Sequence, residues 1–373
     1  MNMKETAINQ AHHGLKAKMV DFAGWEMPLQ YSSIIKEHKA VREKVGLFDV
    51  SHMGDVIVEG RDAKRLMDYL FTQRVSKYSF GDCIYTHLLN ENGGIIDDMI
   101  IYPIEENRYF FIPNAARTGV VFDWLRSHAN DLDVDIKDHT EELCCFALQG
   151  PRARKVMERI ADEDIHSLKF FKFGIGTIKP DGMIASKKAM FDDENMVIIS
   201  STGYTGEDGF ELSTWNKNAP GLWKMIMDVG SEFEIEPIGL GARDSLRLEK
   251  GFLLSGTDFD EGVTTIETGW DMVIDWDHDF IGKEALESMK NNPARRILFG
   301  VEIKGSGLPR HGQNIFIGNE PIGEITSGGY SPMIEKGIGL GFIPKEMAKK
   351  GTDISIEIRG KKVPAVLRRP PFC

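Results

Sequence analysis

Hydrophobic positions along this chain change repeatedly between helical and strand spacing, which predicts interleaved helices and strands. In 32–46, apolar residues three or four apart predict a helix that Ser32 or Ser33 caps and Gly46 ends. Helical spacing recurs in 61–71 and 118–131. Within 142–161 a strand is followed by a further helix, with Pro151 near its first turn. Runs typical of short strands, bounded by turn residues, occupy the intervening segments 47–60 and 84–114.

The C-terminal part of the chain is predicted to be a separate β-barrel. From Ile297 onward, short strand-like runs alternate with glycine turns. Many short strands at close spacing are typical of small barrels and sandwiches. We therefore expect a barrel of fewer than about a hundred residues.

The stretch GGIIDDMIIY, residues 93–102, places two adjacent aspartates inside an apolar strand. Side chains alternate along a strand, so Asp97 and Asp98 must point to opposite faces. If protein covers both faces, at least one carboxylate is buried at a cost in free energy. We expect Asp97 to make a structural hydrogen bond to neighbouring backbone near the turn.

Composition and charge narrow the class of protein. The 373 residues are 42% hydrophobic and 27% charged, which is typical of a globular chain. No apolar run approaches the roughly 20 residues of a membrane span, and the N-terminus lacks the features of a signal or transit peptide. A cytoplasmic protein is therefore expected. The net charge of −12 disfavours nucleic-acid binding.

The four cysteines show no spacing typical of a metal site or a disulfide framework. Cys83, Cys144, Cys145 and Cys373 contain no C-x-x-C pair and have no histidine at ligand spacing. Buried reduced thiols are the expected state, and we expect no metal.

Two other motifs fail as metal or nucleotide sites. Segment 275–286 has aspartates at calcium-loop spacing, but Phe280 and Leu286 occupy the positions that need glycine and glutamate. Asp279 is instead expected to cap the following helix. The sequence GIGLGF, residues 337–342, lacks the last glycine of a dinucleotide fingerprint and leads into a strand-like segment.

Three polar features have both a functional and a simpler interpretation. SSTGYTGEDGFEL (200–212) contains glycines that form a tight turn, which would direct Tyr204 and Glu211 towards a neighbour, but a loop with a solvated acid is the simpler interpretation. Arg243 and Asp244 begin an amphipathic helix and would also fit a surface ion pair. His52 lies in an apolar strand, where a core histidine with satisfied hydrogen bonds is expected more often than a catalytic one.

Taken together, these segments resemble the aminomethyltransferase family, the T-protein of the glycine cleavage system. The resemblance is carried in order by nine segments: MVDFAGWEMPLQY (19–31), GLFDVSHMG (46–54), NENGGIIDDMIIY (90–102), NAAR (114–117), LQGPRA (148–153), STGYTGEDGFEL (201–212), GLGARDSLRLEKGFLLSG (239–256), DFIGKEAL (279–286) and GEITSGGYSP (323–332). It therefore covers essentially the whole chain.

The resemblance implies an α+β fold of three domains around a central hole that holds tetrahydrofolate. Residues 1–277 would form the folate-binding region, and 278–373 the barrel domain. The folate-binding region would consist of two interleaved subdomains, roughly 1–50 plus 140–250 and 51–139 plus 251–277. The reaction would move an aminomethyl group from the dihydrolipoyl arm of H-protein to tetrahydrofolate, releasing ammonia and 5,10-methylenetetrahydrofolate.

The resemblance also implies roles for individual residues. Asp98 matches the catalytic aspartate near N5 and N10 of the folate, where a fixed anion would stabilise developing positive charge. Glu211 would accept the pterin N–H and NH2 together, and Arg243 would neutralise a carbonyl or carboxylate of the ligand. The remaining folate-lining positions are Tyr85, Ile112, Asn114 and Tyr204.

This chain departs from the family pattern at a few positions. Arg117 stands where many members have asparagine, Ser255 replaces an aromatic residue, and the aromatic position near Phe170 or Phe171 lacks its hydroxyl. The same fold is compatible with two other functions. A tetrahydrofolate-dependent demethylase of a small methylated compound is the alternative. A non-catalytic folate protein of iron–sulfur assembly is rejected because 249–262 lacks that group's cysteine.

Overall fold

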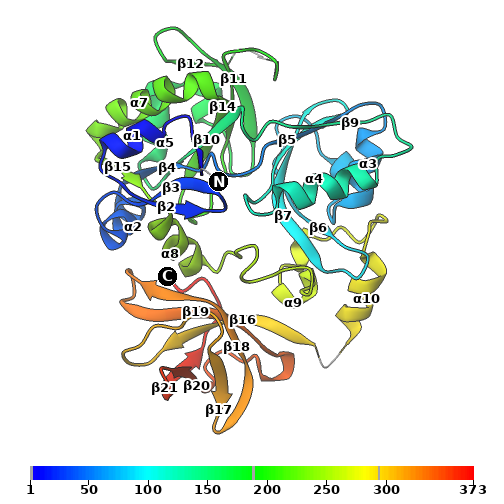
Figure 1. Cartoon of the computed structure of the whole chain (residues 1–373), viewed down its shortest axis with the longest axis vertical. Coiled ribbons are helices and arrows are strands. Elements are labelled where there is room, and N and C mark those ends of the chain that lie inside the picture. The colour runs from blue at the N-terminus through cyan, green and yellow to red at the C-terminus, as the bar shows by residue number, and fades with distance from the viewer. Residues whose placement is uncertain (1–2, 187–189, 293–294) are drawn as a thin grey trace. The chain divides into compact units, whose positions relative to one another are not determined.

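The computed structural model describes residues 3–186, 190–292 and 295–373 and divides them into two compact units. The first unit comprises Met1–Met67, Arg74–Tyr85 and Met99–Arg243. The second comprises Asp68–Gln73, Thr86–Asp98 and Asp244–Cys373. The chain therefore passes between the units inside single elements, and each unit is built from segments distant in sequence (Figure 1).

The first unit contains a seven-stranded sheet in the order β12-β11-β13-β14-β10-β4-β15. Its strands are β12 Ile184–Ala185, β11 Phe173–Ile178, β13 Met196–Ser200, β14 Gly209–Trp215, β10 Leu143–Gln149, β4 Val45–Asp49 and β15 Ile235–Ile238. Every residue of β10 is buried, as its apolar sequence LCCFALQ favours.

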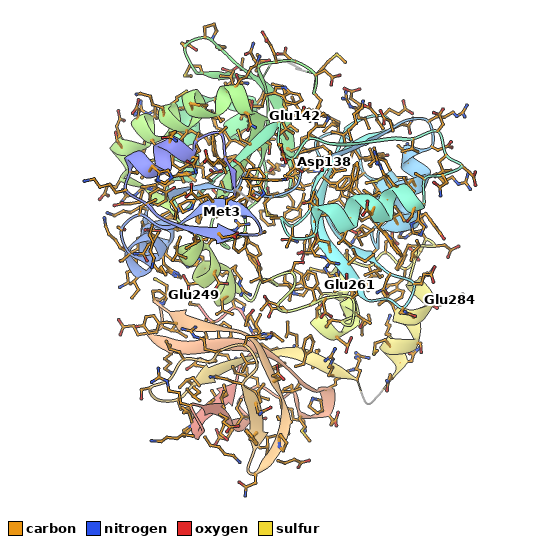
Figure 2. The ribbon with its side chains drawn as sticks, in the orientation of Figure 1. Met3, Asp138, Glu142, Glu249, Glu261 and Glu284 are labelled. Atoms are coloured by element: carbon orange, nitrogen blue, oxygen red, sulfur yellow. The ribbon has the colours of Figure 1, made fainter. Side chains whose placement is uncertain are left out.

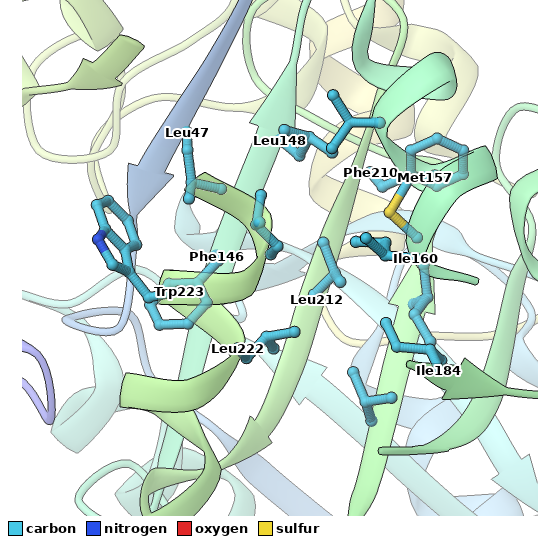
Figure 3. Packing of buried hydrophobic residues seen from close by; sticks show 14 of the residues in the cluster. Leu47, Phe146, Leu148, Met157, Ile160, Ile184, Phe210, Leu212, Leu222 and Trp223 are labelled. Atoms are coloured by element: carbon cyan, nitrogen blue, oxygen red, sulfur yellow. The ribbon is translucent and has the colours of Figure 1, made fainter. Parts of the chain in front are cut away.

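Helices pack their apolar residues onto this sheet. The main ones are α5 Ala153–Ile160 and α7 Ala219–Gly230, with the short α6 Glu163–His166. Figure 3 shows the cluster that results, with Met157 and Ile160 from α5 and Leu222 and Trp223 from α7 around the strands. Burial of each such large apolar side chain contributes about 1.5–3 kcal/mol, so this cluster fixes the strands on which the candidate site is built.

Smaller elements of the first unit precede and flank this sheet. They are β1 Lys4–Glu5, β2 Lys18–Phe22 and β3 Trp25–Gln30, which form a three-stranded sheet, with helices α1 Asn9–Gly14 and α2 Ile34–Glu43. The hydroxyl of Ser33 accepts a hydrogen bond from the Lys36 N–H, which confirms Ser33 as the cap of α2.

A five-stranded sheet in the order β6-β7-β8-β5-β9 carries the aspartate pair. Its strands are β6 Ile84–Leu89, β7 Ile95–Glu105, β8 Arg108–Ile112, β5 Val56–Glu59 and β9 Asp135–Asp138. The helices near it in sequence are α3 Ala63–Leu70 and α4 Thr118–Ser127. Strand β7 starts in the second unit and continues into the first at Met99.

The second unit contains the predicted barrel. Six strands close in the order β16-β19-β18-β17-β20-β21. Their bounds are β16 Arg296–Ile303, β17 Asn314–Ile317, β18 Glu320–Ser331, β19 Lys336–Pro344, β20 Asp353–Ile358 and β21 Lys361–Leu367. Isoleucines and valines from these strands fill its interior.

The remaining elements of the described residues are three α-helices and several short 3-10 turns. The α-helices are α8 Leu240–Lys250, α9 Thr265–Thr268 and α10 Lys283–Asn291. Single 3-10 turns are η1 Val75–Lys77, η2 Asn216–Asn218, η3 Ser231–Phe233, η4 Asp271–Val273 and η5 Lys345–Met347. None of the helices formed by residues 3–186, 190–292 and 295–373 combines the length and apolar character of a membrane span.

The predicted helices, the strand pair within 47–60, the other strand segments and the C-terminal barrel are confirmed, and three local predictions are wrong. His52, expected within a strand, lies in a turn between β4 and β5. Helix α2 ends at Glu43, and Gly46 lies inside strand β4. A Cβ at Gly46 would lie 2.4 Å from Ile238, so this glycine serves close strand packing instead of ending a helix. The N-cap of α10 is Gly282, and Asp279 pairs with Lys283 instead of capping the helix.

Candidate active site

Strand β14 places Glu211 on the face of the sheet opposite the α5–α7 cluster. Its neighbours Phe210 and Leu212 belong to that cluster and are fully buried. Because side chains alternate along a strand, Glu211 points the other way, and it is partly exposed. The strands beside it place Ala147 of β10 and Ser200 of β13 opposite Glu211. Glu211 is therefore a strand residue on a rigid sheet, which corrects the interpretation as a solvated loop acid.

Three buried hydroxyl groups lead from the protein interior to Glu211. Thr202 Oγ1 donates to Glu211 Oε2 at 2.5 Å. Ser200 Oγ lies 2.6 Å from Thr202 Oγ1, and Tyr102 OH lies 3.3 Å from Ser200 Oγ. All three residues are at most 3% exposed. No motif in the sequence indicates this chain, because Tyr102 is about a hundred residues from the others.

The glycine-rich loop 203–208 is held by Gln149 at the end of β10. Gln149 donates to the Thr202 carbonyl at 3.0 Å and accepts from Thr205 Oγ1 at 2.7 Å. A Cβ at Gly203 would lie 2.0 Å from Gln149 Oε1, so only glycine permits this approach. The tight turn predicted from the glycines is thus anchored to the same sheet that carries Glu211.

Tyr204 and Arg243 come together next to this loop. The Arg243 guanidinium carbon lies 4.7 Å from the centroid of the Tyr204 ring, which is a cation–π geometry. Both side chains are partly exposed. Asp244, predicted as a possible ion-pair partner of Arg243, instead pairs with Arg247 at 2.7 Å. Arg243 therefore presents a cation at an aromatic surface of the first unit.

His52 is a buried histidine close to Arg243. It is 2% exposed, and its ring meets Phe22 edge-on at 5.3 Å. Burial, with the positive charge of Arg243, lowers the pKa of His52 to about 3, so the ring is neutral at physiological pH. Among the described residues its Nδ1 has no hydrogen-bond partner. The expectation of a core histidine with satisfied hydrogen bonds is thus wrong for Nδ1.

Tyr85, Ile112 and Asn114 lie on or just after the five-stranded sheet and are partly exposed. Ile112 stands opposite Ile100 of β7 and packs against the cluster that contains Tyr102. The Asn114 carbonyl accepts hydrogen bonds from the Arg117 N–H and the Thr118 hydroxyl, which ties it to the start of α4.

The aspartates of β7 occupy different environments, as strand alternation predicts. Asp97 is fully buried and accepts a hydrogen bond from Ser255 Oγ at 3.0 Å. Asp98 is partly exposed. Ser255 is thus one partner of the buried carboxylate.

The predicted site residues fall into two groups. Six belong to the first unit: Tyr85, Ile112, Asn114, Tyr204, Glu211 and Arg243. Within it, the structure brings Tyr204 and Arg243 together. Asp98 belongs to the second unit, one residue before the chain enters the first.

The structure gives the surroundings of the cysteines and of other possible metal ligands. Cys83, Cys144 and Cys145 are buried thiols, as predicted, whereas Cys373 is exposed, so the expectation of a buried thiol is wrong for Cys373. Burial raises the pKa of all three buried thiols. In the part of the chain that the structure describes, no three His, Cys, Asp or Glu side chains converge as metal ligands would.

Comparison with known protein families decides the family. The model described as "GCVT N-terminal domain" matches residues 8–278, and that of the "Glycine cleavage T-protein C-terminal barrel domain" matches 296–373. The chain belongs to the glycine cleavage T-protein family. This assignment confirms the resemblance noted from the sequence and the enzyme class that it implied.

Individual relatives support the same conclusion. An aminomethyltransferase of Clostridium botulinum (strain Okra / Type B1) is 40% identical over 98% of this chain and 96% of its own length. An aminomethyltransferase of Caldanaerobacter subterraneus is also 40% identical, over 98% and 95%. The crystal structure of the glycine cleavage system aminomethyltransferase T from Bartonella henselae superposes with a TM-score of 0.88 at 30% identity, covering 100% of this chain and 98% of that one. The predicted α+β fold with a C-terminal barrel is confirmed.

Proposed function

We propose that this T-protein family member transfers the one-carbon unit of aminomethylated H-protein to tetrahydrofolate, with release of ammonia. The observation that carries the folate assignment is Glu211, a half-buried carboxylate on a rigid strand that already accepts a hydrogen bond from Thr202. A carboxylate held in this way matches the adjacent N–H and NH2 donors of a pterin edge.

The other first-unit residues complete the recognition of the ligand. Tyr204 offers an aromatic face, and Arg243 a cation for a carbonyl or carboxylate. Tyr85, Ile112 and Asn114 are proposed to line the same site. When bound, tetrahydrofolate supplies the amines that accept the one-carbon unit.

Asp98 is the proposed catalytic residue. Departure of ammonia develops positive charge on the transferred carbon, and a fixed carboxylate stabilises that charge. Asp98 is partly exposed on a strand, so its carboxylate is held by a rigid element and remains accessible to a substrate. The fully buried Asp97 supports the strand through Ser255.

The proposed donor partner is lipoylated H-protein, with no nucleic acid and no membrane involved. We also retain the domain division expected from the sequence: 1–50 plus 140–250, 51–139 plus 251–277, and a barrel domain 278–373. Within the second unit, the barrel strands begin at Arg296.

Tetrahydrofolate binding by the Glu211→Gln variant tests the recognition step. Loss of the charged acceptor should weaken binding by about 10- to 100-fold, as expected for hydrogen bonds to a charged group. Glu207→Gln is the matched control, because Glu207 lies on the adjacent loop and pairs with Arg42 at 2.8 Å. Equal affinities of Glu211→Gln and the native chain would contradict the role of Glu211.

A donor comparison separates the proposed function from the demethylase alternative. The native chain would be incubated with tetrahydrofolate and either aminomethylated H-protein or small N- and O-methylated compounds. Turnover with aminomethylated H-protein, and none with the methylated compounds, supports the proposal. Turnover with a methylated compound, and none with H-protein, would replace it by the demethylase.

A further inference from the structure

The hydroxyl groups of Tyr102, Ser200 and Thr202 have only one consistent order of donors and acceptors. Tyr102 is 1% exposed, enclosed by Phe110 at 5.7 Å and Phe173 at 5.4 Å between ring centroids. Among the described residues, the partner of its hydroxyl is Ser200 Oγ. A buried phenol must place its proton on an acceptor, so Tyr102 donates to Ser200.

This first step fixes the direction of the others, because each hydroxyl carries a single proton. Ser200 accepts from Tyr102 and donates to Thr202 at 2.6 Å. Thr202 then donates to Glu211 Oε2. The reverse order would leave the Tyr102 proton buried without an acceptor. Burial also raises the pKa of Tyr102 well above its usual value, so the phenol keeps its proton across the physiological range.

The order of protons determines what Glu211 presents to a ligand. Because Thr202 delivers a proton towards Oε2, this oxygen acts as a hydrogen-bond acceptor. In the part of the chain that is described, Oε1 makes no hydrogen bond, and it lies on the partly exposed side chain. Glu211 is therefore held as an acceptor for N–H groups.

We propose that Tyr102, Ser200 and Thr202 form a one-directional hydroxyl relay that holds Glu211 as the acceptor for the ligand's N–H groups. The three are positioning residues for folate recognition. The inference rests on the proposed function of the same site and adds the residues that set the orientation and donor order of its hydrogen bonds.

Four variants test the relay through tetrahydrofolate affinity between pH 5.5 and 8. Thr202→Val keeps the side-chain volume but removes the donor, and it should weaken binding about tenfold at pH 7, with a further loss that begins at higher pH than in the native chain. Thr202→Ser restores the hydroxyl and should stay within about threefold. Tyr102→Phe, at the far end, should cause a smaller loss with the same pH direction. The double variant Tyr102→Phe/Thr202→Val should bind no more weakly than Thr202→Val.

The coupling and the pH profile distinguish a relay from a general structural effect. A loss that is uniform across pH, or fully additive in the double variant, would overturn the relay. Thr202→Ser binding as weakly as Thr202→Val would overturn it as well.

A ligand-free measurement keeps the relay testable if the proposed function fails. Exchange of the Tyr102 hydroxyl proton would be followed by NMR on protein with 13C-labelled tyrosine, assigned with Tyr102→Phe. The exchange should be slow in the native chain and faster in Thr202→Val, which does not touch Tyr102. If the native chain fails to bind tetrahydrofolate, the folate assignment falls, and an unchanged exchange rate would overturn the relay independently.

Discussion

Asp97 and Asp98 show how one strand gives two adjacent carboxylates different tasks. The buried Asp97 needs partners, and Ser255 supplies one of them. Asp98 faces the other side, where it is partly exposed and open to chemistry. Side chains alternate in an extended strand, so the sequence predicts that the two carboxylates face opposite sides, and the fold decides which of them is buried.

Substituting each aspartate by asparagine should separate the two tasks. Asp98→Asn should lower kcat at least ~100-fold with folate still bound, on the scale of removing one preorganised electrostatic group. Asp97→Asn should affect turnover much less and mainly lower the free energy of unfolding. Steady-state kinetics and urea unfolding of both variants provide the check. Similar losses of kcat in the two variants would refute this division.

Asp55 should make stability depend on pH. It is 2% exposed, and among the described residues its Oδ1 has no hydrogen-bond partner. Burial, with the negative charge of Asp138 at the end of β9 (Figure 2), raises the pKa of Asp55 well above its usual value. Its stabilising contribution is therefore complete below the unfolded pKa of about 4 and is lost as pH rises towards the folded pKa.

Asp55→Asn removes this titration. Its free energy of unfolding relative to the native chain should increase between pH 5 and 7, by at most about 1.4 kcal/mol per pH unit. Urea unfolding at several pH values measures the difference, and the exposed Asp131→Asn is the control. A difference that is constant with pH would show that Asp55 is ionised in the folded chain.

At the scale of elements, spacing predicts the type of each segment but not its close contacts. Helix α2 is confirmed because its helical spacing reflects one buried face, and the strands β7 and β8 are confirmed as apolar runs that are buried on both faces. A glycine after an amphipathic helix usually marks its end, which predicts that role for Gly46, whereas close packing against Ile238 places Gly46 inside β4. The three glycines before Glu211 make a loop acid the simpler interpretation of that residue alone, because the pairing of β14 with β10 and β13 cannot be inferred from them.

The start of β7 depends on a close approach of two backbones at Gly94. An added Cβ there would lie 1.8 Å from the Glu261 carbonyl oxygen. Gly94→Ala should therefore lower the free energy of unfolding by about 1–3 kcal/mol or more, because backbone must move. Gly119→Ala in α4, where nothing lies within 4 Å, should be neutral or stabilising by up to about 1 kcal/mol. Thermal unfolding of both compares them, and equal midpoints would contradict the close approach.

At the scale of the whole molecule, family resemblance supplied what local patterns could not. Asp98, Glu211 and Arg243 are predicted as site residues because ordered segments along the chain resemble one family. The residues that support them, such as Tyr102 behind Glu211, join positions 98 residues apart. Contacts of this kind form only when the fold brings distant strands together, so the spacing of residues along the sequence does not predict them.

One measurement tests the central claim, that this chain moves a one-carbon unit from H-protein to tetrahydrofolate. H-protein bearing a 13C-labelled aminomethyl group would be mixed with the native chain and tetrahydrofolate, with Asp98→Asn as the control. We predict that the label appears in 5,10-methylenetetrahydrofolate with one ammonia per labelled carbon, and at least ~100-fold more slowly in the control. Retention of the label on H-protein, with tetrahydrofolate bound to the native chain, would contradict the proposed function.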